Sequence, residues 1–120
     1  MLQYKAPLRD MRFLINEVLD YSAHYATLSN GADATPEMVD AILEGAATLC
    51  EEVLAPLNES GDREGCQLKD GVVTTPKGFK EAYAEFVAGG WQGLSFPVEY
   101  GGQGLPMSLN LMKSEMMGAA

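Results

Sequence analysis

Three glycines surround Gln103 in the stretch GGQG, residues 101–104, and their backbone N–H groups are the first candidates for binding a ligand. Glycine-rich loops hold phosphates because their N–H groups can approach the phosphate oxygens closely. A P-loop also needs a lysine followed by Ser or Thr, and a dinucleotide-binding loop needs a preceding strand. The stretch has neither feature, so the sequence favours tight backbone turns over phosphate binding.

Other residues that carry chemistry are few and scattered. His24 has no obvious Ser or Cys to activate, so we expect an ordinary helix-surface or core histidine. One histidine together with Cys50 and Cys66 does not make a metal site. Cys50 falls on the apolar face of a predicted helix and is expected to be buried, and both cysteines are expected to be reduced. Adjacent acidic residues are interpreted as solvated surface.

The most unusual stretch is GGWQGLSFPVEYGGQGLP, residues 89–106, which combines six glycines with the only tryptophan of the chain. Large aromatic side chains mark a packed core, and glycines permit close backbone approach. We therefore predict a shaped loop whose backbone passes close to a helix, a ligand or a partner domain. Four of the seven methionines follow residue 106, and they either line an apolar ligand channel or fill a core.

Composition and charge limit the possible functions. A chain of 120 residues is one domain at most, and 47% hydrophobic residues are typical of a globular protein. A net charge of -9 without a basic patch disfavours binding to nucleic acid or to an anionic membrane surface. No apolar run approaches the roughly 18 residues that span a bilayer, and no signal peptide is visible. We therefore expect no membrane span and a cytoplasmic location.

The periodicity of apolar residues predicts an all-α fold with one short hairpin and four helices, at about 10–26, 36–57, 76–89 and 106–118. Expected caps are Asp10, Thr35 and Thr75. Pro56 is expected to kink or end the second helix, and the polar stretch 58–65 is expected to be a loop. The hairpin spans residues 66–75 with its turn at Asp70-Gly71, and it is expected to rest on the helices because an isolated hairpin is marginally stable. Gly89-Gly90 should end the third helix.

The first three predicted helices each have an apolar face that should be buried, and the fourth has an apolar face at helical spacing that should lose its cover if the chain is cut from a longer protein. These faces comprise, in chain order, Met11, Leu14, Ile15, Val18, Leu19 and Tyr25; Val39, Ile42, Leu43, Ala46, Cys50, Val53, Leu54 and Leu57; Phe79, Ala82, Tyr83, Phe86 and Val87; and Leu109, Met112 and Met116. Leu111 and Met117 make the last helix apolar on a second side, and the chain ends in Gly-Ala-Ala without a basic last turn. These features predict a truncated piece whose last helix is exposed and self-associates.

A resemblance to a known family covers essentially the whole chain. Gly90-Trp91, the loop Pro97–Gly104 and the acidic Glu115 on the helix that follows match a pattern of acyl-CoA dehydrogenases. The region resembles the N-terminal helical domain of that family. The opening YKAPLRDMRFLINEVLD, residues 4–20, is similar to the N-terminal extension of a subgroup that includes 3-methylmercaptopropionyl-CoA dehydrogenases. The resemblance divides the chain into an extension with the first helix, residues 1–34, and the helical domain, residues 35–120, incomplete at its C-terminus.

The resemblance implies a flavin-dependent parent enzyme that oxidises an acyl-CoA to the 2,3-enoyl-CoA. Its implied cofactor is FAD, its implied electron acceptor is an electron-transfer flavoprotein, and its implied assembly is a homo-oligomer. The flavin-contacting segments and the catalytic glutamate of the family have no match here, so we assign no catalytic, cofactor-binding or metal residue and expect the chain alone to be inactive. The resemblance places five residues in the wall of the substrate pocket: Tyr100, Gly101, Gly102, Met112 and Met116.

Two functions of other classes remain open on the sequence. The chain is alternatively a self-standing helical interaction module that uses its last helix as the apolar face. It is alternatively a small acyl- or lipid-binding domain with a methionine-lined cavity. The loop of the family and the unfinished C-terminus favour the dehydrogenase interpretation over both.

Overall fold

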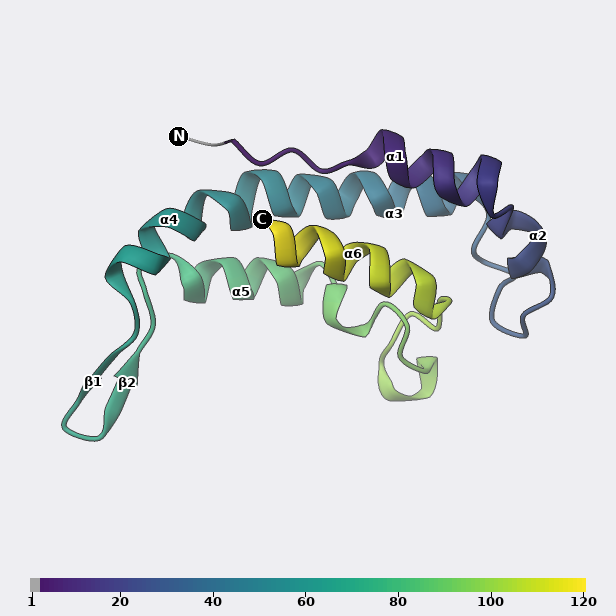
Figure 1. Cartoon of the computed structure of the whole chain (residues 1–120). Helices are drawn as coiled ribbons and strands as arrows, with labels where there is room; N and C mark the ends of the chain where they lie inside the picture. Colours follow the sequence, from purple (N-terminus) through teal and green to yellow (C-terminus); the bar gives the residue numbers. More distant parts are fainter. Residues whose placement is uncertain (1–2) are drawn as a thin grey trace.

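The computed structural model describes residues 3–120 and is built from helices around one core, with a hairpin at one end (Figure 1). The predicted all-α fold with a short hairpin is confirmed. The elements are α1 (Leu8–Phe13), a π-helical stretch (Leu14–Val18), α2 (Tyr21–Ala26), α3 (Pro36–Thr48), a second π-helical stretch (Leu49–Leu54), α4 (Ala55–Glu64), β1 (Gln67–Lys69), β2 (Val72–Thr74), α5 (Phe79–Ala88), two 3-10 turns (Trp91–Gly93 and Val98–Tyr100) and α6 (Met107–Ala119). The principal extents of 53 × 37 × 16 Å describe a flat, elongated body.

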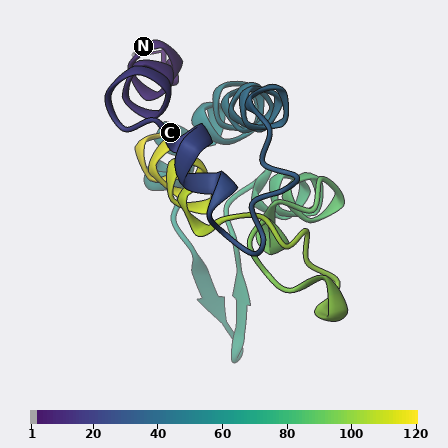
Figure 2. The same cartoon turned by 90° about the vertical axis from the view of Figure 1, so that its right-hand side faces the viewer.

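Helix α3 is the centre of the fold. The Thr35 hydroxyl accepts a hydrogen bond from the Met38 N–H at 3.2 Å, and Pro36 occupies the first turn, as the sequence predicts. Its buried face packs against α1 and α6, so helices from the two ends of the chain share one core (Figures 1 and 2). The buried side chains of α3 are Val39, Ile42, Leu43, Ala46 and Ala47.

The predicted first helix is broken, which corrects the sequence interpretation. Asp20 adopts a left-handed conformation with φ of 46°, and its carboxylate caps α2 by accepting the Ala23 N–H at 3.4 Å. Helix α1 begins at Leu8, directly after Pro7, so Asp10 lies inside the helix and does not cap it. Since this break and the π-helical stretch shift the helical phase, only part of the predicted stripe is buried. Met11, Ile15 and Tyr25 join the core, while Leu14, Val18 and Leu19 are exposed.

The second helical region continues past Pro56, so of the kink or end that the sequence predicts at this residue, the end is wrong. A π-helical stretch separates α3 from α4, and Pro56 falls in the first turn of α4. Proline is tolerated early in a helical segment, and the chain remains helical here although Pro56 donates no hydrogen bond to the preceding turn. Residues 58–64 therefore belong to a helix and not to the predicted loop.

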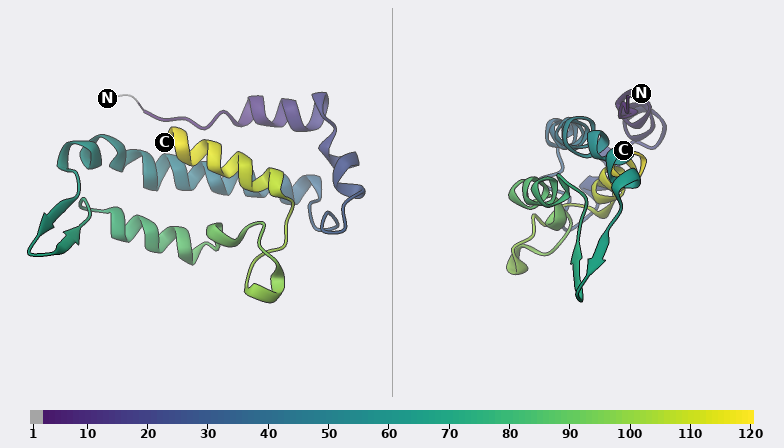
Figure 3. Two further views of the ribbon diagram at one scale, coloured as in Figure 1. Left: turned by 60° about the horizontal axis from the view of Figure 1, so that its bottom comes forward. Right: turned by 90° about the vertical axis from the view of Figure 1, so that its left-hand side faces the viewer.

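The hairpin has the predicted turn but not the predicted contacts. Asp70 and Gly71 both have positive φ, 51° and 76°, as a two-residue type I′ turn requires. The strands pair antiparallel with Leu68 opposite Val73. All six strand residues are exposed, and the hairpin projects from the body (Figures 1 and 3). The expectation that the hairpin rests on the helices is wrong.

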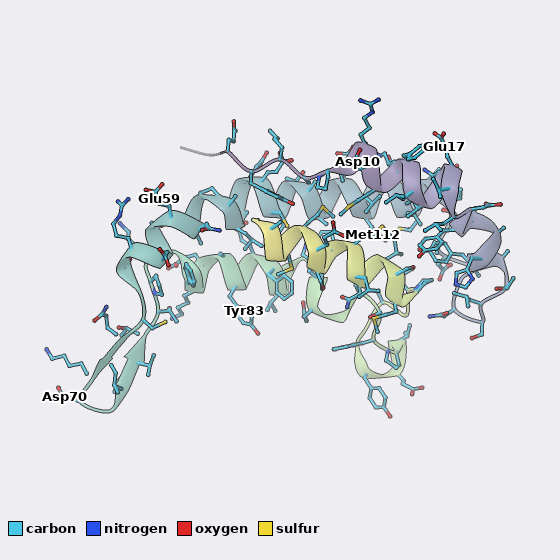
Figure 4. All side chains as sticks on the ribbon, in the orientation of Figure 1. Asp10, Glu17, Glu59, Asp70, Tyr83 and Met112 are labelled. Atoms are coloured by element: carbon cyan, nitrogen blue, oxygen red, sulfur yellow. The ribbon has the colours of Figure 1, made fainter. Side chains whose placement is uncertain are left out.

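Helix α5 begins and packs differently from the prediction. It starts at Phe79 after Gly78, which is in a left-handed conformation, so Thr75 is not its cap. It ends at Ala88 before the Gly89-Gly90 pair, as predicted. Only Ala82 of its predicted face is buried, and Tyr83 points away from the other helices (Figure 4). The apolar face of α5 is thus largely uncovered in the described structure.

Helix α6 is buried where the sequence predicts exposure. Leu109 and Met116 are fully buried and Met112 nearly so, because α6 lies along α3 (Figures 1 and 3). The apolar side chains of α6 that do face outward are Met107 and Leu111. Side chains of this size contribute about 2 kcal/mol each when fully buried. The apolar face of α6 that was expected to be exposed and to self-associate is therefore buried against α3.

Candidate functional site

The loop between α5 and α6, residues 89–106, is closed on itself by backbone hydrogen bonds. Gly93 C=O accepts the Gln103 N–H at 2.8 Å, and Leu94 C=O accepts the Leu105 N–H at 3.1 Å. The side chains of Leu94 and Leu105 are buried in the common core. The two arms of the loop are thus joined at their base, and the residues between them form a compact protrusion below α6 (Figure 1).

Trp91 anchors the start of this loop against α3. An alanine Cβ at position 45 would lie 3.1 Å from Cη2 of the Trp91 ring, so glycine at this position of α3 allows close approach of the indole. Trp91 is partly buried and packs against the core. The glycines and the tryptophan serve one purpose here, because the large ring fixes the loop to a helix that leaves room for it.

The N–H groups of the GGQG stretch are all used inside the loop. Gly101 donates to Val98 C=O at 3.0 Å, and Gly102 donates to Pro97 C=O at 3.1 Å. Gln103 donates to Gly93 C=O, and Gly104 donates to Phe96 C=O at 2.8 Å. A phosphate cradle needs N–H groups that are free to point at the ligand. In this conformation the loop does not fit the pyrophosphate of a flavin nucleotide or the phosphates of a coenzyme A.

The five residues predicted as pocket wall lie in different surroundings. Tyr100 is 81% exposed at the loop tip, and Gly101 next to it is also exposed. Gly102 is half-buried, whereas Met112 and Met116 lie in the core between α6 and α3. Among residues 3–120, neither of the two surface hollows described by the structure is lined by any of the five. Their role as pocket wall remains a prediction.

The loop tip carries an exposed apolar group that includes two of the aromatic residues of the stretch. Phe96, Val98 and Tyr100 all point largely to solvent. Large apolar side chains at a loop tip add nothing to the core of the described structure. They are therefore available for contact with another surface.

Lys113 is the buried charge that sequence reasoning missed. Its ammonium donates to Trp91 C=O at 3.0 Å and to Asn110 Oδ1 at 2.8 Å, and it lies 5.5 Å from the centre of the Phe86 ring. Burial lowers the pKa of this lysine from its ordinary value. The spacing held a signal, because Lys113 follows Leu109 by four residues and so shares its buried face. Lys113 ties α6 to the start of the loop.

A second polar cluster surrounds the N-terminal segment. Glu51 accepts hydrogen bonds from Lys5 Nζ at 2.7 Å and from the Ala6 N–H at 2.9 Å, and these two partners lower the pKa of its carboxyl. The Tyr4 hydroxyl is buried and has no hydrogen-bond partner in the described part of the chain. Burial raises the pKa of Tyr4, and the nearby Glu51 carboxylate adds to this effect. The cluster holds the N-terminal segment against the π-helical stretch that follows α3.

A hollow of about 640 Å³ lies beside this cluster, between the N-terminal segment, α4 and the end of α6. Asn58 spans part of it by donating to the Ala120 C=O at 2.8 Å. The lining residues include Tyr4, Arg63 and Ala119. The lining residues come from the N-terminal segment, α4 and the end of α6, so no single helix fixes their relative positions.

The remaining candidates form no reactive group. His24 lies on α2, with its ring centre 5.9 Å from that of Tyr21 and 6.1 Å from that of Tyr25. Cys50 is buried as predicted and Cys66 is exposed, and neither forms a disulfide. Within residues 3–120, no three His, Cys, Asp or Glu side chains gather as a metal site would require. In the same range, no helix has both the length and the apolar character needed to cross a bilayer.

Comparison with known proteins places these features in a family. No family model matches the chain. The chain is 39% identical over 119 residues to a 3-methylmercaptopropionyl-CoA dehydrogenase of Ruegeria pomeroyi, which covers 99% of this chain and 20% of that protein. It is 31% identical over 83 residues to a butyryl-CoA dehydrogenase of Syntrophomonas wolfei, which covers 67% of this chain and 14% of that protein. The chain thus spans a fifth or less of the length of these relatives. The chain is therefore homologous to a segment of the acyl-CoA dehydrogenases, as its Pro97–Gly104 loop and the helix after it indicate.

Proposed function

We propose that the chain is part of a flavin-dependent acyl-CoA dehydrogenase, which oxidises an acyl-CoA to the 2,3-enoyl-CoA. The single observation that carries this proposal is the 39% identity to a dehydrogenase across 119 residues, which includes the shaped loop. Since the chain spans only 20% of that relative, the substrate class and the reaction belong to the proposed longer protein. That protein is proposed to be cytoplasmic, to form a homo-oligomer and to pass electrons to an electron-transfer flavoprotein.

The proposed role of this chain is to bind and shape, and not to carry out the chemistry. In the longer protein FAD would accept the hydride from the substrate, but the GGQG loop, with its N–H groups occupied, does not fit the phosphates of that cofactor. We assign the loop tip around Tyr100, Gly101 and Gly102 to the wall of the acyl pocket. Met112 and Met116 would support this wall from the core beneath α6. An apolar wall excludes water from the reacting carbon atoms.

The experiment compares the 120-residue chain with the full-length protein encoded by the same reading frame. The full-length protein should be yellow, with a stoichiometric flavin spectrum, and should reduce a dye when an acyl-CoA is added. The chain alone should be colourless and inactive. A full-length protein without flavin and without acyl-CoA-dependent dye reduction would overturn the proposal. A flavin-loaded, active 120-residue chain would overturn the assigned division of roles.

A further inference from the structure

The β1–β2 hairpin has one wholly apolar face. Leu68 stands opposite Val73, and the flanking pairs are Gln67 with Thr74 and Lys69 with Val72. Because side chains alternate along a strand, the Leu68–Val73 pair lies on one face and the two flanking pairs on the other. The second face carries an amide, a hydroxyl and an ammonium group, and its one apolar side chain, Val72, stands opposite Lys69 and is 62% exposed. Such a division is typical of a hairpin with one covered face and one solvated face.

The apolar face is uncovered in the described structure. Leu68 is 73% exposed and Val73 is 62% exposed. A two-stranded hairpin is marginally stable by itself, and it normally needs a third strand or a packed helix. The hairpin therefore extends from a well-packed body without contributing to its core.

The base of the hairpin is nevertheless firmly mounted. A carboxylate oxygen of Glu64 accepts the Lys77 N–H at 3.1 Å, and the Glu64 C=O accepts Gln67 Nε2 at 3.0 Å. Directly after the hairpin, the Phe79 ring lies so close to Gly61 that an added Cβ would be 2.6 Å from it. These contacts fix the direction in which the strands project. The hairpin is held out from the body as a structured extension (Figure 4, where Asp70 marks its tip).

We propose that the Leu68–Val73 face docks onto the part of the dehydrogenase polypeptide that lies outside residues 1–120. This inference rests on the proposed function. The relative that matches 99% of this chain has four-fifths of its own length outside the match, so a large covalently linked partner is available in that protein. Lys69, on the other face, would remain in solvent.

The size of the face favours a linked partner over a second copy. Two such side chains expose on the order of 200 Å², whereas a stable interface between separate proteins buries about 800 Å² on each partner. A covalently linked surface meets the hairpin at a millimolar or higher effective concentration, so a small contact suffices. The same contact between two free copies would not hold at micromolar concentration.

Cys66, which directly precedes β1, reports on this contact. The structure exposes Cys66 and buries Cys50, so alkylation followed by peptide mass mapping reads the two thiols separately. In the 120-residue chain Cys66 should react rapidly. In the full-length protein Cys66 should react at least about tenfold more slowly, and the strand amides should be protected from hydrogen exchange by a similar factor. Cys50 should remain unreactive in both proteins.

Paired substitutions test which face makes the contact. Leu68→Lys with Val73→Lys should restore rapid Cys66 alkylation in the full-length protein and lower its melting temperature. Val72→Lys with Thr74→Lys adds the same charge to the same hairpin on the other face, leaves the Gln67–Glu64 contact in place, and should change neither. In the 120-residue chain the two double variants should melt alike. If the first double variant gives no folded full-length protein, the rates of Cys66 alkylation in the unmutated chain and the unmutated full-length protein still test the docking.

Three results would overturn the proposal. The first is equal Cys66 alkylation in the chain and in the full-length protein. The second is an equal effect of the two double variants. The third is loss of the Cys66 protection when the full-length protein is diluted to monomers, because that result would assign the cover to a second copy. A flavin-loaded protein with an exposed hairpin refutes the docking alone, whereas a flavin-free protein with a protected hairpin refutes the proposed function alone.

Discussion

Replacing Gly102 by alanine should open the loop between α5 and α6. The added Cβ would lie 2.1 Å from the Phe96 carbonyl oxygen and 2.5 Å from the Phe96 carbonyl carbon. Both atoms belong to the backbone, so no side-chain rotation relieves the overlap. Either the Phe96 peptide or the 102–104 segment must move by about 1 Å to reach ordinary van der Waals distance.

The cost can be worked from the hydrogen bonds that such a movement breaks. Gly102 N–H donates to Pro97 C=O at 3.1 Å, and Gly104 N–H donates to Phe96 C=O at 2.8 Å. Each contributes about 1 kcal/mol, and partial exposure of the Leu94–Leu105 contact adds a similar amount. We expect a loss of about 2–4 kcal/mol in the free energy of unfolding, which lowers the melting temperature of a domain of this size by roughly 10–15 °C.

Two other glycines provide matched controls in the same thermal melt, followed by far-UV circular dichroism. Gly101→Ala meets no atom within 4 Å but must keep φ of 85°, so it should cost about 1–2 kcal/mol. Gly118→Ala lies in α6 in open space and should be neutral or stabilising by up to about 1 kcal/mol. The reasoning fails if the Gly102 variant melts within a few degrees of the unmutated chain, or if the Gly101 variant is the less stable of the two.

Two predictions concern pH. Lys5 and the Ala6 N–H lower the folded pKa of Glu51. The stability from this contact is therefore present above the unfolded pKa and is lost as the pH falls through the folded pKa. In thermal melts between about pH 3 and pH 6, the melting temperature of the unmutated chain should fall more steeply with acid than that of Glu51→Gln. Burial lowers the folded pKa of Lys113, so the unfolded state binds more protons between that pKa and about 10.4, and stability rises with pH across this window. Lys113→Met should lower the free energy of unfolding by about 1–3 kcal/mol at neutral pH, because it leaves the Trp91 carbonyl without its donor. In denaturant titrations, the difference in free energy of unfolding between the unmutated chain and this variant should increase as the pH approaches 10.

The elements that the sequence predicts correctly are those set by neighbouring residues. Thr35 with Pro36 starts α3, Asp70-Gly71 makes the hairpin turn, and Gly89-Gly90 ends α5, because each signal acts within one turn of backbone. The left-handed Asp20 has no comparable signal, since aspartate tolerates that conformation without requiring it. Residues 58–64 were predicted as a loop because Pro56 was expected to interrupt the helix. In the structure a π-helical stretch precedes Pro56 and places it in the first turn of α4.

The candidate site was predictable to a similar degree. The sequence predicts a shaped loop at 89–106 that lies close to a helix, a ligand or a partner domain, and the structure supplies the helix position, Gly45, that receives the Trp91 ring. The role of Lys113 depends on Trp91, 22 residues earlier, so no local pattern could reveal its carbonyl partner. The buried methionines were assigned to an exposed face because helical spacing gives a face but not the neighbour that covers it.

The π-helical stretch Leu49–Leu54 also determines to which side of the helix axis each side chain of α4 points. Each additional residue in a helix turns the following side chains by roughly 100° about the axis. With the present setting, Leu57 meets Gly78 and Gly61 receives the Phe79 ring, and these contacts mount α5 and the hairpin. Shortening the stretch by one residue would preserve a continuous helix yet point both positions to a different side. The length of the π-helical stretch therefore sets the rotation of α4 about its axis, and with it the direction in which the hairpin projects.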